Sequence, residues 1–125
     1  MAKSKTKILI VEDESLLLDL YTTKLEQSGY QVVKASDGAA GLSLAQIEKP
    51  NLILLDILMP KVDGYEMLKK IKNNAKTKKL PVIIFSNLSQ KDEIEKGLKL
   101  GANDYIIKTS VTPTELAQRV KDYLR

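Results

Sequence analysis

Four short apolar runs stand out in this sequence, and each is followed by a residue that carries an oxygen or an amine. The runs cover residues 8–11, 52–55, 82–85 and 105–107, and they are followed by Glu12 and Asp13, Asp56, Ser86 and Lys108. Runs that are apolar at every position are typical of strands covered on both faces, as in parallel sheets. Because parallel strands end at one edge of their sheet, we expect three carboxylates, a hydroxyl and an ammonium to meet there.

Helical patterns separate these runs, and capping residues mark their ends. Residues 16–28 have apolar side chains at helical spacing and precede Gly29, which suits a left-handed cap. A strand is expected at 31–35, followed by a helix capped by Asp37 that runs to about residue 49. The other expected helix starts are Asp63 with Glu66 as capping-box partner, Ser89 with Asp92, and Thr112 with Pro113 and Glu115; the helices from Asp63 and Ser89 would run to residue 73 and to Gly101.

This alternation of five strands and five helices predicts an α/β fold. The remaining strands would be 51–55, 82–85 and 105–108, and residues 59–64 would form a loop. Right-handed crossovers place helices on both faces, which gives a three-layer, doubly wound domain with a five-stranded parallel sheet. The strand order 2-1-3-4-5 is one of two common solutions, and its crevice lies outside the first and third strands. Glu12, Asp13 and Asp56 would border that crevice.

Composition excludes several kinds of chemistry. The 125 residues suffice for one domain and include neither cysteine nor histidine, which rules out Ser-His and Cys-His catalysis, histidine metal ligands and phosphohistidine on this chain. The lack of cysteine fits a reducing compartment such as the cytoplasm, and no apolar run is long enough to span a membrane. The net charge is +4, with lysines concentrated between residues 69 and 79. Because no aromatic side chains are interleaved there, we favour a solvated surface over a nucleic-acid site.

The predicted cluster of carboxylates suits magnesium and phosphoryl chemistry. Crowded carboxylates repel one another, so such a site needs a nearby cation, a raised pKa or a hard metal ion. Oxygen ligands favour Mg²⁺, which completes its coordination with water and phosphate oxygens. A carboxylate beside Mg²⁺ can attack phosphorus and form an acyl phosphate, and the Lys108 ammonium and the Ser86 hydroxyl could stabilise the transferred group.

A magnesium-dependent phosphatase would use a similar nucleophile and has to be weighed as an enzymatic alternative. Such an enzyme would need a second acid close by, usually two residues after the nucleophile, to protonate the leaving group and activate water. Here that position is Leu58, and the chain has no histidine to replace the acid. The sequence therefore favours a phosphorylated carboxylate that persists as a signal over one that turns over in catalysis.

Together these segments resemble the receiver domain of two-component response regulators, in particular stand-alone, chemotaxis-regulator-like members. The resemblance rests on Ile-Val-Glu-Asp, Leu-Leu-Asp-Ile-Leu-Met-Pro followed by Asp-Gly, Phe-Ser, and Gly-Ala-Asn-Asp-Tyr-Ile-Ile-Lys, and it covers essentially the whole chain. It implies a flavodoxin-like fold with strand order 2-1-3-4-5, an order that the chemotaxis member of the family itself exemplifies. It also implies a signalling protein rather than an enzyme.

The resemblance implies a role for each polar strand end. Asp56 would accept a phosphoryl group from a histidine kinase or a histidine phosphotransfer protein. Mg²⁺ would be bound by Asp13, Asp56 and the backbone carbonyl of Leu58, with Glu12 acting directly or through water. Lys108 would pair with the phosphoryl oxygens, Ser86 would hydrogen-bond to one of them, and Tyr105 would turn inward when Ser86 is recruited.

Each assignment has a simpler alternative when its residue is taken alone. Asp13 could cap the first helix, Ser86 could belong to a turn, Lys108 could be a surface lysine and Tyr105 an ordinary strand aromatic. Asp56 has no such alternative, because burial of an acid between Leu55 and Ile57 is costly without a partner. The shared placement of these residues favours the functional interpretation over the separate structural ones.

Two residues depart from the family pattern. The lysine is usually followed by proline in a cis peptide, but here Thr109 follows, and a cis bond before a non-proline residue costs about 2.5–4 kcal/mol. We therefore expect a trans Lys108–Thr109 bond on a shifted loop. Asn87 replaces a residue that is usually small, and it would either crowd the phosphoryl pocket or donate a hydrogen bond. Since both departures border the site, a receiver-like interaction module that does not use phosphorylation is the main alternative.

Partner surfaces are also implied. The downstream target would bind the fourth helix, the fifth strand and the fifth helix, which phosphorylation would alter. On the first helix, Leu16 and Leu18 lie at the borders of a wide apolar arc and could contact the kinase side, although the helix propensity of leucine explains them equally well. Because the chain ends with the last helix, we expect residues 1–125 to form a single receiver domain with no output domain.

Overall fold

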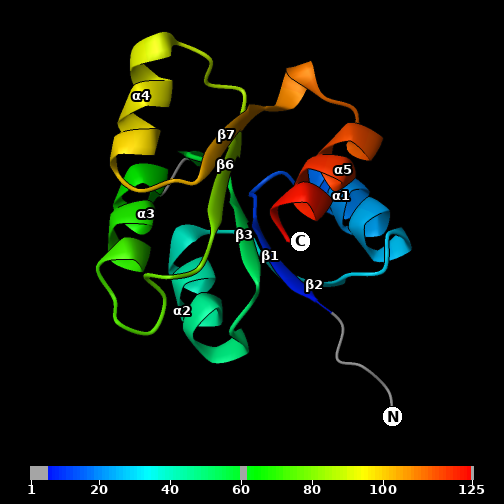
Figure 1. The fold of residues 1–125 in the computed structure, drawn as a ribbon, viewed down its shortest axis with the longest axis horizontal. Helices are drawn as coiled ribbons and strands as arrows, with labels where there is room; N and C mark the ends of the chain where they lie inside the picture. Colours follow the sequence, from blue (N-terminus) through cyan, green and yellow to red (C-terminus); the bar gives the residue numbers. More distant parts are fainter. Residues whose placement is uncertain (1–5, 60–61, 125) are drawn as a thin grey trace.

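The computed structural model describes residues 6–59 and 62–124, and its centre is a parallel sheet (Figure 1). Within the described residues this sheet has five strands, in the order β2-β1-β3-β6-β7. Counted along these five, the order is 2-1-3-4-5, so the predicted topology is confirmed. The strands are β1 (Lys7–Val11), β2 (Gln31–Ala35), β3 (Leu52–Leu55), β6 (Val82–Ser86) and β7 (Asp104–Ile107).

Helices cover both faces of the sheet, which gives the predicted three layers (Figure 1). On one face lie α1 (Ser15–Gln27) and α5 (Pro113–Tyr123); on the other lie α2 (Gly38–Glu48), α3 (Gly64–Lys72) and α4 (Lys91–Lys99). Alternate residues of each strand enter different cores: Leu9 and Val11 pack with α2 and α3, whereas Ile8 and Ile10 pack with α1 and α5. Burial on both faces explains why the strands are apolar at every position.

Several predicted helix ends are confirmed. Thr112 and Glu115 form a reciprocal capping box with Pro113 in the first turn of α5, and the Asp37 side chain accepts a hydrogen bond from the Ala40 amide. Gly29 has a φ of +98° just after α1, the left-handed conformation expected of it. These signals depend on residues close in sequence, which is why they could be read without the tertiary structure.

Two other predicted helix starts are wrong in detail. Asp63 does cap α3, but it accepts from the Tyr65 amide, and Glu66 pairs with Lys69 instead of completing a capping box. The fourth helix begins at Lys91, with Gln90 rather than Ser89 at its N-cap and no side-chain capping bond. Its N-terminus is held by contacts with α3, described below, which no local pattern could indicate.

The predicted loop 59–64 and two other expectations also need correction. A short antiparallel ladder joins β4 (Leu58–Met59) to β5 (Val62–Asp63); residues 60 and 61 of the predicted loop lie outside the described residues. Lys108 is not the last strand residue but begins a short 3₁₀ turn, η1 (Lys108–Ser110). On α1, Leu16 is 84% exposed, but Leu18 is 8% exposed and packs in the core, so only Leu16 remains available for a partner.

No helix in the described part of the chain is both long and apolar enough to cross a membrane. This finding agrees with the absence of long apolar runs in the sequence.

Candidate functional site

The polar strand ends meet at the carboxyl edge of the sheet, as the sequence predicts. The Glu12 amide bonds to the Ala35 carbonyl and the Asp56 amide to the Val11 carbonyl, each at 3.0 Å, so the ladder continues into the site residues. Carboxylate oxygens of Glu12, Asp13 and Asp56 lie within 4.8 Å of one another. The backbone of β1 and β3 therefore fixes the acidic cluster.

Lys108 extends into this cluster from the end of β7. Its Nζ donates to Asp56 Oδ2 at 2.9 Å and also to Glu12 Oε1. All three residues are buried: Glu12 is 2% exposed, Asp56 5% and Lys108 7%. A buried lysine that bridges two buried carboxylates is incompatible with the alternative of an ordinary surface lysine.

The second oxygen of each carboxylate accepts a backbone hydrogen bond. Asp56 Oδ1 accepts from the Leu58 amide at 2.9 Å, and Glu12 Oε2 accepts from the Glu14 amide at 3.2 Å. These bonds use the residues immediately after each strand end. They fix the orientation of both carboxylates and place Leu58 directly beside Asp56.

Burial and the ion pairs act in opposite directions on the charged groups. Burial raises the pKa of Glu12 above its ordinary value, although the hydrogen bond from Lys108 opposes this shift. For Lys108, burial alone lowers the pKa, but the bonds to Glu12 and Asp56 outweigh it, so the pKa lies above its ordinary value. Lys108 is therefore a charged ammonium at neutral pH and can stabilise negative charge in the site.

The cluster still carries excess negative charge. Asp13 is partly exposed at its rim and completes a set of three carboxylates that faces one ammonium. Two negative charges are thus uncompensated when all three acids are ionised. Oxygen ligands with this charge suit a hard divalent cation, so the residues present fit the predicted magnesium site.

A second group of contacts surrounds Ser86 at the end of β6. Ser86 is fully buried, and its Oγ accepts a hydrogen bond from the Leu88 amide at 3.3 Å. The Tyr105 hydroxyl donates to the Leu88 carbonyl, so Tyr105 is oriented towards the loop after β6. Burial raises the pKa of Tyr105 to about 12, and the neighbouring Ser86 hydroxyl opposes the shift. The contacts on this side are neutral hydrogen bonds.

The two residues that depart from the family pattern contact each other. The Thr109 amide donates to Asn87 Oδ1 at 3.2 Å. No peptide bond between described residues is cis, so the expected trans bond between Lys108 and Thr109 is confirmed. This is neither of the two roles expected for Asn87, because its amide oxygen accepts the hydrogen bond, whereas the side chain was expected to crowd the pocket or to donate a bond.

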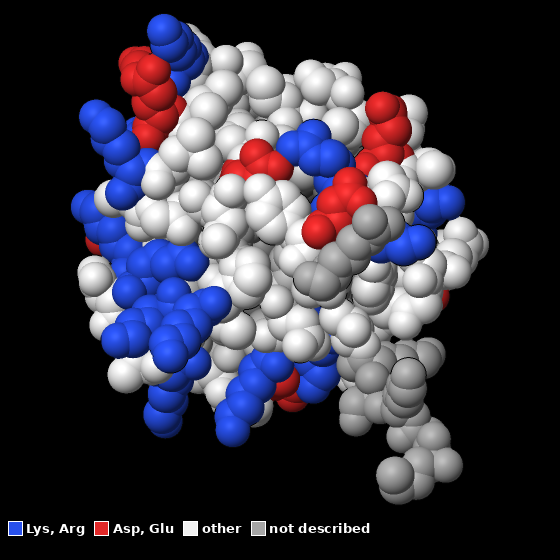
Figure 2. Space-filling view, in the orientation of Figure 1, with Lys and Arg blue, Asp and Glu red and all other residues white. Residues whose placement is uncertain are grey.

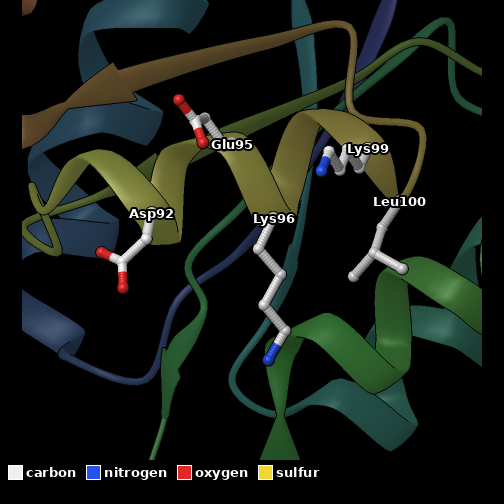
Figure 3. A pocket seen from close by; sticks show the side chains of 5 residues that line it. All are labelled: Asp92, Glu95, Lys96, Lys99 and Leu100. Atoms are coloured by element: carbon white, nitrogen blue, oxygen red, sulfur yellow. The ribbon is translucent and has the colours of Figure 1, made fainter.

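Helix α4 borders the site and is tied to α3. The Tyr65 hydroxyl donates to the Glu93 carbonyl oxygen at 3.0 Å and to Glu93 Oε2 at 2.6 Å. Lys96 Nζ lies 4.3 Å from the centre of the Tyr65 ring, and Figure 3 shows Lys96 and Leu100 pointing from α4 towards α3. A cavity of about 450 Å³ runs along this helix, lined by Asp92, Glu95, Lys96, Lys99 and Leu100.

The concentrated lysines lie elsewhere on the surface. Figure 2 shows positive charge gathered over the end of α3 and the loop that follows it. The last turn of α3 contributes Lys69, Lys70 and Lys72. This loop precedes β6 and therefore lies at the opposite edge of the sheet from the acidic cluster, so these lysines do not compensate the charge of the site.

Sequence reasoning missed three of these contacts. It assigned Lys108 to phosphoryl oxygens and Glu12 to a metal, and did not predict that the two side chains pair with each other. It gave no indication of the bond between Asn87 and Thr109 or of the bond between Tyr65 and Glu93. The only available signal was the unusual identity of residues 87 and 109.

Comparisons with known proteins agree on one family. A family model described as "Response regulator receiver domain" matches residues 8–121. The chain is 39% identical over its 125 residues to the "Probable transcriptional regulator ycf27" of Cyanophora paradoxa and covers 51% of that protein. It thus spans about half the length of the curated relatives it matches.

Solved structures give the same result. The CheY-like receiver domain protein from Methanospirillum hungatei JF-1 is 32% identical, with a TM-score of 0.89 over 97% of this chain and 94% of that one. The BeF3-activated N-terminal receiver domain of Klebsiella pneumoniae RstA is 30% identical, with a TM-score of 0.86 over 95% of this chain and 98% of that one.

Proposed function

Because the chain belongs to the response regulator receiver domain family, we propose that it is a phosphorylation-dependent switch that accepts a phosphoryl group on Asp56. Members of this family are signalling modules rather than catalytic enzymes, and membership implies that a kinase is a partner. The observation that carries the proposal is the buried contact of Lys108 with both Asp56 and Glu12 beside Asp13. This arrangement combines a nucleophile, a positive charge and a set of metal ligands at one point.

Transfer to Asp56 exchanges one bond for another. An oxygen of the Asp56 carboxylate forms a bond to phosphorus while the bond from phosphorus to an imidazole nitrogen of the donor histidine breaks. The electron pair of that bond remains on the imidazole, which takes up a proton. Lys108, now 2.9 Å from Asp56 Oδ2, would then contact the new phosphoryl oxygens and stabilise their charge. The donor would be a histidine kinase or a histidine phosphotransfer protein.

The proposed metal is Mg²⁺, bound by Glu12, Asp13, Asp56 and the backbone carbonyl of Leu58. When bound, it would offset the charge of the carboxylates and of the incoming phosphoryl group. The support for this assignment is the set of carboxylate oxygens within 4.8 Å and the excess negative charge described above. Leu58 is held beside Asp56 by its own amide, so its carbonyl lies in the same turn.

The phosphoryl group is expected to persist after transfer. Hydrolysis would be fastest with an acid or base near the phosphoryl group, but position 58 holds leucine and the chain has no histidine. The phosphorylated state would therefore last long enough to act as a signal. This argument separates the proposal from a magnesium-dependent phosphatase.

Phosphorylation would act on the rest of the molecule through Ser86 and Tyr105. Ser86 would hydrogen-bond to the phosphoryl group, and the loop after β6 and Tyr105 would follow it. The surface that changes would be formed by α4, β7 and α5, where a downstream target would bind. We also propose that residues 1–125 form one receiver domain, and the cytoplasmic location remains a prediction.

The test is incubation of the purified chain with Mg²⁺ and a small phosphodonor, followed by intact-mass measurement. The proposal predicts the gain of one labile phosphoryl group by the wild type and none by Asp56→Asn. A receiver domain known to be modified under the same conditions serves as the positive control. If the control is modified and the wild type is not, the chain is instead a receiver-like interaction module.

A further inference from the structure

Asn87 and Thr109 connect the two loops that hold Ser86 and Lys108. In the parallel pair of β6 and β7, Ser86 lies opposite Ile107, so the two strands end side by side at the carboxyl edge of the sheet. Asn87 directly follows Ser86, and its Oδ1 accepts the Thr109 amide at 3.2 Å. Thr109 directly follows Lys108 in the turn η1. A side chain of one loop thus fixes the backbone of the other.

The position of this turn matters because Lys108 has to reach far. In the sheet β6 lies between β7 and β3, so the side chains of Lys108 and Asp56 together span two strand spacings of about 4.8 Å each to meet. The Lys108 Nζ bonds to carboxylates at the ends of two neighbouring strands, so a shift of the Lys108 backbone would move the ammonium away from at least one of them. Misplacement of a group by about 1 Å can slow a reaction by large factors.

We propose that Asn87 is a positioning residue for phosphoryl transfer to Asp56, acting through the Thr109 amide on Lys108. This inference rests on the proposed function. The β7 ladder fixes the backbone before Lys108, and the Asn87 bond fixes it immediately afterwards. Asn87 is exposed and does not contact Asp56, Glu12 or Lys108 by any hydrogen bond in the described structure, so it would act through the backbone.

The central experiment measures the rate of phosphorylation by a small phosphodonor at saturating Mg²⁺. Asn87→Ala removes the acceptor and should slow the reaction roughly two- to tenfold, the range expected for one neutral hydrogen bond. The matched control is Asn74→Ala, because Asn74 is a partly exposed asparagine whose Oδ1 also accepts a backbone amide, that of Lys76, at 2.8 Å. It lies in the loop before β6, at the other edge of the sheet, and its loss should leave the rate unchanged.

A double-mutant cycle tests the route through Lys108. If Asn87 acts by positioning Lys108, Asn87→Ala should slow the wild type but have no further effect on a Lys108→Ala variant. Slowing that persists in the Lys108→Ala background would mean that Asn87 acts directly on the donor or the pocket, and would overturn the proposal. Equal or faster phosphorylation of Asn87→Ala would overturn it as well.

A second measurement does not depend on phosphorylation. Amide hydrogen exchange at Thr109 should be faster in Asn87→Ala than in the wild type and unchanged in Asn74→Ala. Unchanged exchange at Thr109 in Asn87→Ala would show that the bond does not hold the turn in solution and would contradict the inference. If the wild type takes up no phosphoryl group at all, the proposed function fails; if it does and Asn87→Ala matches it, only this inference fails.

Discussion

Around Asp56 the contacts are ionic and buried, whereas around Ser86 they are neutral and extend into an exposed loop. Lys108 bridges Asp56 and Glu12 in the interior. On the other side, the Ser86 hydroxyl accepts from the Leu88 amide and the Tyr105 hydroxyl donates to the Leu88 carbonyl. The ionic side, formed by Asp56, Glu12 and Lys108, is already arranged to accept a phosphoryl group. The neutral side, formed by Ser86, Tyr105 and Leu88, can rearrange at a low cost in free energy.

Energetics support this division. If the resting form dominates by 99 to 1, reversal of that ratio requires about 5.5 kcal/mol of differential stabilisation. One neutral hydrogen bond to Ser86 contributes about 0.5–1.5 kcal/mol. The contacts of the phosphoryl group with Lys108 and the metal ligands must therefore carry most of the switch, and Ser86 directs the change.

The largest expected effect is the loss of phosphorylation in Asp56→Asn. This change keeps the size of the side chain but removes the nucleophilic carboxylate, so intact-mass measurement should find no phosphoryl gain under conditions that modify the wild type. Uptake of one phosphoryl group by the variant would mean that another residue is the acceptor.

The next effect is the cost of removing the buried charge. Lys108→Met keeps most of the side-chain volume but leaves Glu12 and Asp56 facing each other, so without Mg²⁺ the free energy of unfolding should fall by about 3 kcal/mol in urea denaturation. The control is Lys69→Met, which removes the exposed ion pair of Lys69 with Glu66 and should change the free energy of unfolding by no more than about 1 kcal/mol. Equal effects of the two substitutions would show that the buried contacts of Lys108 stabilise the fold no more than an exposed ion pair does, and would contradict the description of the ionic side.

A smaller effect is expected where α4 is tied to α3. Tyr65→Phe removes the hydroxyl that binds Glu93 and should lower the free energy of unfolding by about 1.5 kcal/mol, with faster amide exchange in α4. Tyr123→Phe is the matched control, because Tyr123 also donates to a carbonyl, that of Asn103 at 2.9 Å, but from α5. If amide exchange in α4 is accelerated in Tyr123→Phe as well, or is not accelerated in Tyr65→Phe, the bond between Tyr65 and Glu93 does not hold the helix.

The last effect is confined to alkaline pH and is the pH dependence of stability due to Tyr105. Its pKa is raised to about 12 in the fold, whereas a tyrosine in the unfolded chain ionises near 10. Between these values the unfolded chain loses a proton that the folded chain retains, so stability falls as the pH rises. In Tyr105→Phe this part of the fall should be absent, as measured by urea midpoints just below pH 10 and close to pH 12. If the urea midpoint falls equally with pH in the wild type and in Tyr105→Phe, the Tyr105 hydroxyl is not buried as described.

The sequence predicted the ionic side better than the neutral side, for a physical reason. Glu12, Asp56 and Lys108 follow apolar strands, and the geometry of a parallel sheet brings strand ends together whatever the loops do. The bonds of Asn87 with Thr109 and of Tyr65 with Glu93 instead join segments whose approach depends on tertiary packing. Neither strand periodicity nor local capping patterns contain that information.

Helix ends show the same contrast on a smaller scale. The capping box of Thr112 and Glu115 was predictable because both partners lie within one turn. The N-cap of α4 is Gln90, one residue after the predicted Ser89, and the first turn is stabilised by Tyr65 of another helix rather than by a side chain at its own N-cap. Sequence patterns were reliable where the stabilising partner was close along the chain.

The most direct test of the central claim is amide hydrogen exchange in α4 and residues 87–90 of Lys108→Ala, before and after phosphorylation verified by intact mass. If the ionic side carries the switch, Asp56 should still accept a measurable amount of phosphoryl group, but the exchange pattern of α4 and its preceding loop should stay as in the resting protein. The wild type, treated in parallel, should show the change. A normal change in the phosphorylated variant would contradict the account.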